Sequence, residues 1–379
     1  DGIYLQDTGT TDNVIKGNYI GVDITGNAPL PNGDRGVQIE SGANNTIVGG
    51  TAAGEGNVMS ANGNDGIIIS DGASPGTGTT GTVIEGNLIG VGADGTTALG
   101  NGTNGVRITT EDGHRIGGTA AGAGNTIAHN GGRGVDIQNA SASANPILGN
   151  SIFSNTGLGI DLEGDGVTPN DPSDVGGNEM LNYPVITSAE EVTGTVTVDY
   201  DIDLPAGNYR IEFFTNGAAH PSGFGDGETL AHSHAVAHPG GSISYSTSFA
   251  GTASDIVTST ATEDGGAGYG STSEYSAAVV VTLPDTTPPV ITLVGSTPID
   301  VEAGPVYFVA GYGAHRYLHA YPTRPISDLN PVNTALLGTY TITYTVSDSQ
   351  GNAATPVTRI VNVIDTTAPV ITLLGSTPI

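Results

Sequence analysis

Short apolar pieces with alternating polar positions run through the first half of the chain. Each piece reads Gly-Ile/Val-x-Ile/Leu, and the pieces occupy residues 2–5, 36–39, 66–69, 105–108, 134–137 and 159–162. An apolar period of two is typical of a half-buried β-strand, and no stretch has the 3.6-residue period of a long amphipathic helix. The pattern therefore predicts very short strands that are separated by corners rich in Gly and Asn.

A longer repeat is superimposed on these pieces. Residues 17–39 align without a gap with residues 86–108, at a separation of 69 residues. Strands this short and this widely spaced do not suit hairpins, so we expect a chain that coils and stacks each strand on its equivalent in the next turn. This half resembles the right-handed parallel β-helix repeat proteins of bacterial surfaces, and the resemblance covers residues 1–165.

The coil assigns directions to the side chains. In each piece the flanking aliphatic residues point inward and the middle residue points outward. Stacking then predicts an outward column made of Tyr4, Gln38, Ile68, Arg107, Asp136 and Asp161. An Asn recurs at one corner of the coil, where stacked amides can satisfy one another. We predict a structural role for these residues, which are Asn18, Asn57, Asn87, Asn125 and Asn150.

The second half of the chain has longer alternating runs. Strand-like stretches at 195–200, 209–214, 242–246 and 275–281 are split by turn residues, which predicts an antiparallel β-sandwich at 184–283. Its sequence resembles the accessory sandwich that often follows β-helix repeats in bacterial proteins. Residues 166–183 are acidic and rich in Gly and Pro, and we expect them to form a linker.

The end of the chain repeats at a period of 80 residues. Residues 285–299 return as 365–379 with differences at only two of fifteen positions. This region resembles the tandem Ig-like repeats of bacterial surface proteins, with one repeat at 284–364 and the start of a further, truncated repeat at 365–379. The expected fold class is all-β, a right-handed parallel β-helix followed by β-sandwich and Ig-like domains, in a fragment of a longer array.

One stretch departs from the Ig-like pattern. Residues 308–325 contain two Arg, two His and three Tyr, whereas such modules usually carry an acidic, Asp- and Gly-rich loop at this place. Two explanations stay open, which are a genuine basic loop and a local reading-frame error in the source sequence.

Charge and composition exclude several classes of partner. The chain has 38 Asp and Glu against 9 Lys and Arg, a formal charge of −29, and no Cys. Nucleic acid is excluded because phosphate binding needs clustered Lys and Arg. Membrane insertion is not expected either, since no apolar run approaches the ~20 residues of a spanning helix. The surplus of acids indicates an extracellular or cell-surface protein.

Candidate catalytic chemistry centres on the outward column. Asp136 and Asp161 lie on adjacent turns next to Arg107, and two carboxyl groups about 5–10 Å apart are what glycoside hydrolysis requires. A polysaccharide lyase would instead use a base with a neighbouring cation. The simpler interpretation is a structural ladder of ion pairs on the outside of the coil, which would contribute about 0–1 kcal/mol if exposed.

Two groups of residues are candidate metal ligands. Alternating acids resemble the oxygen ligands of a calcium loop, and they are Asp161, Glu163, Asp165, Asp171 and Asp174. An EF-hand is excluded because the twelfth position of the loop is Pro172. His232, His234 and His238 share one face of a predicted strand, which is a candidate transition-metal site.

These observations favour a fragment of a secreted or cell-surface bacterial protein with a structural or adhesive role. We expect it to be stabilised by calcium and to bind a polysaccharide or a cell-surface glycan through loops stacked on one side of the coil. Head-to-tail self-association is a further expectation, because a β-helix has unpaired strand edges at its ends. The alternative is a carbohydrate-active β-helix enzyme, a polysaccharide lyase or glycoside hydrolase.

Overall fold

The computed structural model describes residues 1–72, 78–109, 112–139, 142–172, 175–304, 312–315, 331–372 and 374. The chain divides into two compact units, Asp1–Leu283 and Pro284–Ile379. Apart from one short 3₁₀ segment, η1 (Gly177–Met180), the regular structure in the described parts consists of β-strands. The expected all-β fold class is confirmed.

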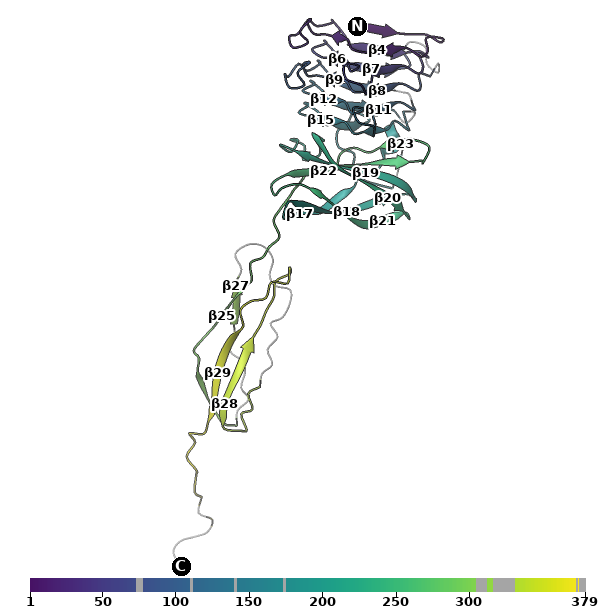
Figure 1. Cartoon of the computed structure of the whole chain (residues 1–379). Helices are drawn as coiled ribbons and strands as arrows, with labels where there is room; N and C mark the ends of the chain where they lie inside the picture. Colours follow the sequence, from purple (N-terminus) through teal and green to yellow (C-terminus); the bar gives the residue numbers. More distant parts are fainter. Residues whose placement is uncertain are drawn as a thin grey trace, which may run out of the picture. The chain divides into compact units, whose positions relative to one another are not determined.

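Three parallel sheets form the first part of the chain (Figure 1). Sheet A contains β1 (Ile3–Leu5), β4 (Val37–Glu40), β7 (Ile67–Ser70), β10 (Val106–Ile108), β13 (Val135–Ile137) and β16 (Ile160–Leu162). Sheet B contains β2 (Val14–Ile15), β5 (Ile47–Gly49), β8 (Val83–Glu85), β11 (Arg115–Gly117) and β14 (Ile147–Leu148). Sheet C contains β3 (Tyr19–Ile20), β6 (Val58–Met59), β9 (Leu88–Ile89), β12 (Thr126–Ala128) and β15 (Ser151–Phe153).

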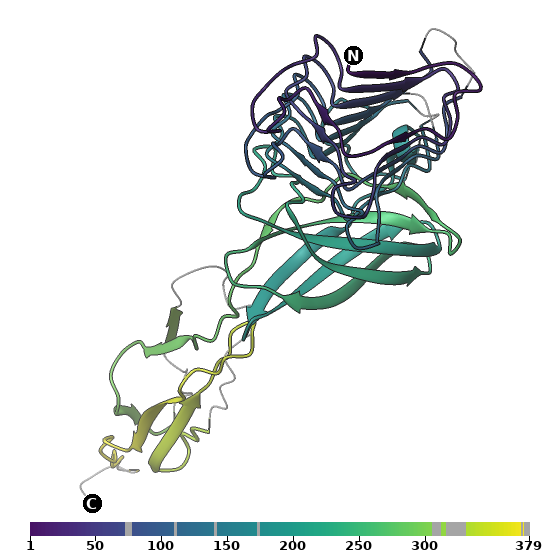
Figure 2. The ribbon, with the colours of Figure 1, turned by 45° about the horizontal axis from the view of Figure 1, so that its top comes forward.

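The order of the strands makes this part a parallel β-helix. The chain visits sheets A, B and C in turn, and each circuit, here called a coil, adds one strand to every sheet. Figure 2 shows the successive coils superimposed around a common interior. The six pieces identified in the sequence are the six strands of sheet A, paired in the expected register, for example Val106 with Val135 and Ile108 with Ile137.

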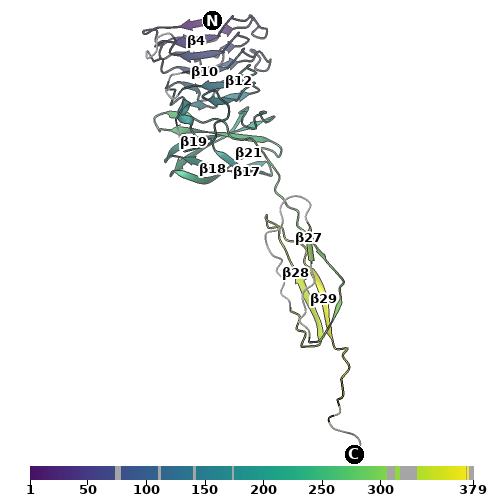
Figure 3. The same cartoon turned by 180° about the vertical axis from the view of Figure 1, so that it is seen from behind.

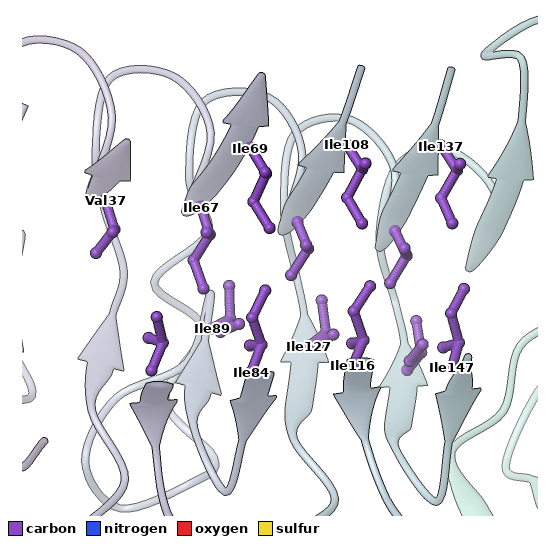
Figure 4. Close-up of a cluster of buried hydrophobic side chains, with 14 of the residues drawn as sticks. Val37, Ile67, Ile69, Ile84, Ile89, Ile108, Ile116, Ile127, Ile137 and Ile147 are labelled. Atoms are coloured by element: carbon purple, nitrogen blue, oxygen red, sulfur yellow. The ribbon is translucent and has the colours of Figure 1, made fainter. Parts of the chain in front are cut away.

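The inward positions form a continuous aliphatic core. Ile67 and Ile69 of β7 face Ile84 of β8 and Ile89 of β9, and all four are fully buried. Figure 4 shows this layer repeated from coil to coil. β-Branched side chains suit such stacks because they pack well on a pleated surface, so a single residue type fills one position in several coils.

Two ladders of Asn side chains run along the corners of the coil. The expected ladder donates from each Asn Nδ2 to the next Asn Oδ1 at 2.9–3.0 Å, through Asn18, Asn57, Asn87, Asn125 and Asn150. The structural role predicted for these residues agrees with this geometry. A second ladder, which the sequence interpretation missed, has the same bonds at 2.8–2.9 Å and contains Asn32, Asn62, Asn101, Asn130 and Asn155.

Alternate coils explain the 69-residue repeat. The first and third coils each carry an excursion after their sheet C strand, and isolated bridges Val22–Pro29 and Val91–Ala98 close the two excursions. The excursions contact each other, because the Ala93 N–H donates to the Gly26 carbonyl at 2.9 Å. The two excursions are therefore stacked loops of the kind that the sequence predicts on one side of the coil.

A β-sandwich follows the coil. One sheet consists of β17 (Val185–Val192), β18 (Thr195–Leu204) and β21 (Gly241–Ala250). The other consists of β20 (Thr229–His238), β19 (Gly207–Asn216), β22 (Ile256–Asp264) and β23 (Tyr269–Thr272), with β24 (Val279–Val280) paired to β22. Inward residues of both sheets, among them Val198, Tyr200, Ile211 and Phe213, form its core.

The sandwich covers the C-terminal end of the coil (Figure 3). Ile152 of β15 and Gly227 exchange two backbone hydrogen bonds of 2.8 Å, and the Ile147 N–H donates to Thr272 Oγ1 at 2.9 Å. The ring of Tyr275 joins the aliphatic core of the coil. Predicted head-to-tail stacking requires open strand edges at both ends, and at this end the sandwich already occupies them.

The segment expected to be a linker, 166–183, packs against the last coil. The Asn178 N–H donates to the Ala142 carbonyl at 2.7 Å, and Asn178 Oδ1 accepts from the Asn145 N–H at 3.0 Å. The side-chain amide of Asn178 thus continues the hydrogen bonding between successive coils into the segment that leads to the sandwich.

The second unit is a smaller β structure. β25 (Val290–Leu293) pairs with β27 (Tyr312–His315), while β26 (Ile299–Glu302), β29 (Val357–Ile364) and β28 (Gly338–Tyr344) form a mixed sheet. Ile291, Ile342, Tyr344 and Val361 form its core. Most of the unusual stretch 308–325 lies outside the described residues, so its two explanations stay open.

Candidate functional site

The outward column of sheet A is aligned as the sequence predicts. Arg107 is the register partner of Asp136, and Asp136 is the partner of Asp161. The column points away from the aliphatic core, yet Asp136 is 0% exposed and Asp161 is 2% exposed. These carboxylates are therefore buried rather than solvated, because neighbouring side chains and the turn after β16 cover them.

A second column supplies much of this cover. It consists of the residue that precedes the Gly of each piece, and its members in the four central pieces are Arg35, Asp65, Asn104 and Arg133. Asn104 Nδ2 donates to Asp65 Oδ1 at 3.0 Å and to Asp136 Oδ2 at 3.3 Å. The sequence interpretation missed Asp65 and Asn104 here, although their constant place before the Gly is a signal that could have identified them.

Arginines hold both buried acids. Arg107 Nε lies 3.4 Å from Asp136 Oδ2, and Arg133 Nη1 lies 4.0 Å from the same oxygen. Arg133 Nε donates to Asp161 Oδ2. Burial raises the pKa of Asp136 to about 6, although Arg133 and Arg107 act in the opposite direction. The arrangement is an ion-pair network on the outside of the coil.

A cleft of about 500 Å³ opens at the C-terminal end of this network. Arg133, Asp161 and Asp165 line it from the coil, His220 and Ser222 line it from the sandwich, and glycines of neighbouring turns complete it. His220 Nδ1 lies 2.8 Å from Ser222 Oγ, and His220 Nε2 has no hydrogen-bond partner among the described residues. The cleft combines carboxylates, a guanidinium, an imidazole and a hydroxyl.

The two predicted catalytic acids differ in their access to this cleft. Asp161 is one of its lining residues, whereas Asp136 and Arg107 are not. Asp136 Oδ1 is buried without a hydrogen-bond partner in the described structure. The geometry thus brings Arg107, Asp136 and Asp161 together as one column, but of these three residues only Asp161 lines the cleft.

The described acids among those predicted to bind calcium do not converge on one point. Asp161 pairs with Arg133, and Glu163 accepts from the N–H groups of Gly177 and Asn139. Asp165 lines the cleft, the Asp171 N–H donates to the Asn182 amide oxygen at 3.1 Å, and Asp174 lies outside the described residues. Within the described ranges, no three His, Asp or Glu side chains are placed to hold a metal ion.

The three histidines of β20 share a face, as predicted, and face the opposite sheet of the sandwich. His234 Nδ1 lies 2.7 Å from the Tyr200 hydroxyl, and His238 Nδ1 lies 2.9 Å from the Tyr245 hydroxyl. His232 Nε2 accepts or donates at 3.1 Å with Thr247. Burial lowers the pKa of His234. Each imidazole therefore has its own partner across the sandwich.

Comparison with known proteins identifies one region. Residues 291–363 match the family described as "Bacterial surface protein, Ig-like domain". No curated protein matches the chain. A solved structure of fibronectin(III)-like modules of Clostridium thermocellum CbhA is 17% identical, with a TM-score of 0.27, and the match covers 48% of this chain and 94% of that chain. The region 291–363 is thus similar to bacterial surface Ig-like domains, and this similarity points to a cell-surface or extracellular location.

A search of the described residues for membrane spans finds no helix with the length and apolar character to cross a bilayer.

Proposed function

We propose that this chain is part of a structural and adhesive protein of the bacterial cell surface, and that its coil and sandwich act together as a glycan-binding unit. The observation that carries the structural role is the junction of coil and sandwich. Backbone hydrogen bonds between Ile152 and Gly227 and the insertion of Tyr275 into the core of the coil join the two parts into one unit. The Ig-like match supports surface display.

Glycan binding draws support from the cleft beside Arg133. Sugar hydroxyls both donate and accept hydrogen bonds, and the cleft offers carboxylate acceptors from Asp161 and Asp165 together with donors from Arg133 and Ser222. Its volume of about 500 Å³ falls within the range of about 300–1,000 Å³ that is typical of small-molecule sites.

The test is binding of the full 379-residue chain to an array of neutral and acidic glycans. We expect the chain to bind specific glycans. The Asp165→Asn and His220→Ala variants should weaken the binding of those glycans that occupy this cleft. Asp199→Asn, a change on the outer surface of the sandwich, is the matched control. The absence of binding to any glycan on the array would contradict the adhesive part of the proposal.

A carbohydrate-active enzyme is the alternative, and one observation favours it. Asp161 lines the cleft beside Arg133, and its register partner in the preceding coil is Asp136, whose pKa burial raises to about 6; two neighbouring carboxyl groups are what glycoside hydrolysis uses. Incubation with a panel of polysaccharides, followed by assays for new reducing ends and for absorbance by unsaturated uronates, tests this alternative. If the chain turns over a polysaccharide and either Asp136→Asn or Asp161→Asn abolishes this turnover, the enzymatic function replaces the structural proposal.

Calcium stabilisation stays a proposal as well. Its ligands would come from the acidic segment, namely Asp161, Glu163, Asp165, Asp171 and Asp174. Melting of the full chain with calcium and with EDTA decides the question, since binding to the folded state alone raises the Tm. A Tm that does not respond to either addition would exclude a structural ion.

A further inference from the structure

A second groove of about 500 Å³ lies on the outer face of sheet C, away from the cleft described above. Its floor consists of Tyr19, Val58 and Leu88, which are register partners in consecutive coils. One wall is the loop 50–54 between β5 and β6, and Ala93 of the second excursion stands on the other side. The groove thus uses both kinds of loop that the 69-residue repeat produces.

Backbone packing fixes the shape of this groove. Gly122, in the equivalent loop two coils further on, lies against Thr51, because a Cβ at Gly122 would come within 2.4 Å of the Thr51 carbonyl. A Cβ at Gly86 would come within 2.2 Å of the Gly50 carbonyl. The corner between the two loops therefore admits only glycine, and the backbone of both loops is held close to the floor.

An aromatic ring is held in the groove with one side open. The backbone of Gly26 packs on the Tyr19 ring, since a Cβ at Gly26 would lie 3.0 Å from two ring carbons. Tyr19 nevertheless stays 49% exposed. The equivalent position in the repeat is Leu88, so the aromatic residue is particular to this groove. A ring that is positioned in advance loses little entropy when a ligand packs on it.

The lining carries no charged side chain, although the chain as a whole has a formal charge of −29. The neighbouring Lys16 and Glu55 form an ion pair at 3.1 Å and neutralise each other. A neutral ligand therefore enters without repulsion, whereas a polyuronate would find no unpaired cation in the lining. The apolar C–H face of a hexose suits the Tyr19 ring, and the Thr51 hydroxyl can bond to its hydroxyl groups.

We propose that this groove binds a neutral hexose polysaccharide, with Tyr19 as the stacking surface. The inference rests on the proposed glycan-binding function and assigns the class of glycan and the place where it binds. An apolar peptide segment is the competing occupant, which the test below separates from a saccharide.

The test uses the full chain and a set of neutral hexasaccharides, including cellohexaose and maltohexaose, with hexagalacturonate as the acidic comparison. Isothermal titration should detect binding of a neutral hexasaccharide, and Tyr19→Ala should weaken it about fivefold to tenfold. Tyr4→Ala is the matched control, because Tyr4 occupies the first coil on sheet A with nearly the same exposure, 48% against 49%. Ala53→Glu should abolish binding while Ala53→Ser preserves it.

The outcomes separate this inference from the broader proposal. If Tyr19→Ala and Ala53→Glu leave the binding of a neutral saccharide unchanged, the groove is not the binding site, while the proposed glycan-binding function stands. Binding of acidic glycans only would overturn the assignment to a neutral class. If the chain binds apolar peptides through Tyr19 and binds no saccharide, the occupant of the groove is a peptide and the inference is overturned. If no glycan on the array binds, the proposed function on which the inference rests fails as well.

Discussion

Leu162 donates its backbone N–H to the carboxylate of Glu274 at 2.9 Å, although 112 residues separate the two in the sequence. Leu162 ends the last strand of sheet A, and Glu274 follows β23 of the sandwich. The second oxygen of Glu274 accepts from the Thr168 N–H at 2.9 Å. A sandwich side chain thus takes the place that the next coil would occupy, and the edge of sheet A ends without an open strand.

The pH dependence of stability follows from this contact. Burial raises the pKa of Glu274 from 4.5 to about 7, against the hydrogen bonds from Leu162 and Thr168. Between about pH 4.5 and 7 the folded state then binds more protons than the unfolded state, so the free energy of unfolding falls as the pH rises through this window. The stabilisation is complete below about pH 4.5 and amounts to about 3 kcal/mol.

Urea unfolding of the full chain at pH 4.5 to 8 measures this effect. Glu274→Gln should reduce the decrease of the free energy of unfolding with rising pH by the contribution of Glu274. Asp136→Asn is the comparison variant. It removes another carboxyl with a raised pKa and shows how much of the pH dependence of the free energy of unfolding comes from an acid other than Glu274. An unchanged slope in Glu274→Gln would show that Glu274 is ionised in the folded state throughout the range.

The Arg133–Asp161 pair should contribute more to stability than a surface pair. Asp161 is 2% exposed and depends on Arg133 for its charge partner, so Arg133→Met leaves a buried carboxylate that is poorly compensated. We expect a loss of about 1–3 kcal/mol in the free energy of unfolding. Lys16→Met breaks the exposed pair with Glu55 and should cost less than about 1 kcal/mol.

A double variant separates charge burial from packing at this pair. Arg133→Met combined with Asp161→Asn removes the unpaired charge and should recover part of the loss. Equal effects of Arg133→Met and Lys16→Met would indicate that the pair is solvated in solution, contrary to the buried geometry.

The sequence predicted the features of the coil that depend on local pattern. Alternation of period two placed the strands of sheet A, and the constant place of the middle residue within each piece put Arg107, Asp136 and Asp161 in one column. The second Asn ladder was also within reach, because Asn32 and Asn101 are equivalent positions of the 69-residue repeat. Asn32 and Asn101 lie outside any strand motif, after the two excursions close, and this place concealed the ladder.

The covered end of the coil could not be predicted in the same way. Glu212, Asp226 and Glu274 read as ordinary polar residues of sandwich strands and turns, and alternation cannot distinguish a solvated acid from one that accepts backbone N–H groups of a distant segment. Glu212 Oε2, for example, accepts from the Gly149 N–H at 2.9 Å. The burial of Asp136 escaped prediction for a related reason, since it depends on Asn104 and Arg133 of the neighbouring column.

The Asn ladder should be most sensitive at its centre. The N–H and Nδ2 of Asn57 both donate to Asn87 Oδ1 at 3.0 Å, and Asn87 is 1% exposed. Asn87→Ala removes the acceptor of both bonds: the Asn57 N–H loses its partner, while Asn57 Nδ2 keeps its bond to the Ile15 carbonyl at 2.8 Å, so we expect a loss of about 1–3 kcal/mol in the free energy of unfolding. Asn18→Ala, at the exposed first rung of the ladder, should cost about 1 kcal/mol or less. Urea unfolding, followed at the transition of the unit Asp1–Leu283, compares the two variants, and equal losses would show that the amides act independently rather than as a stacked ladder.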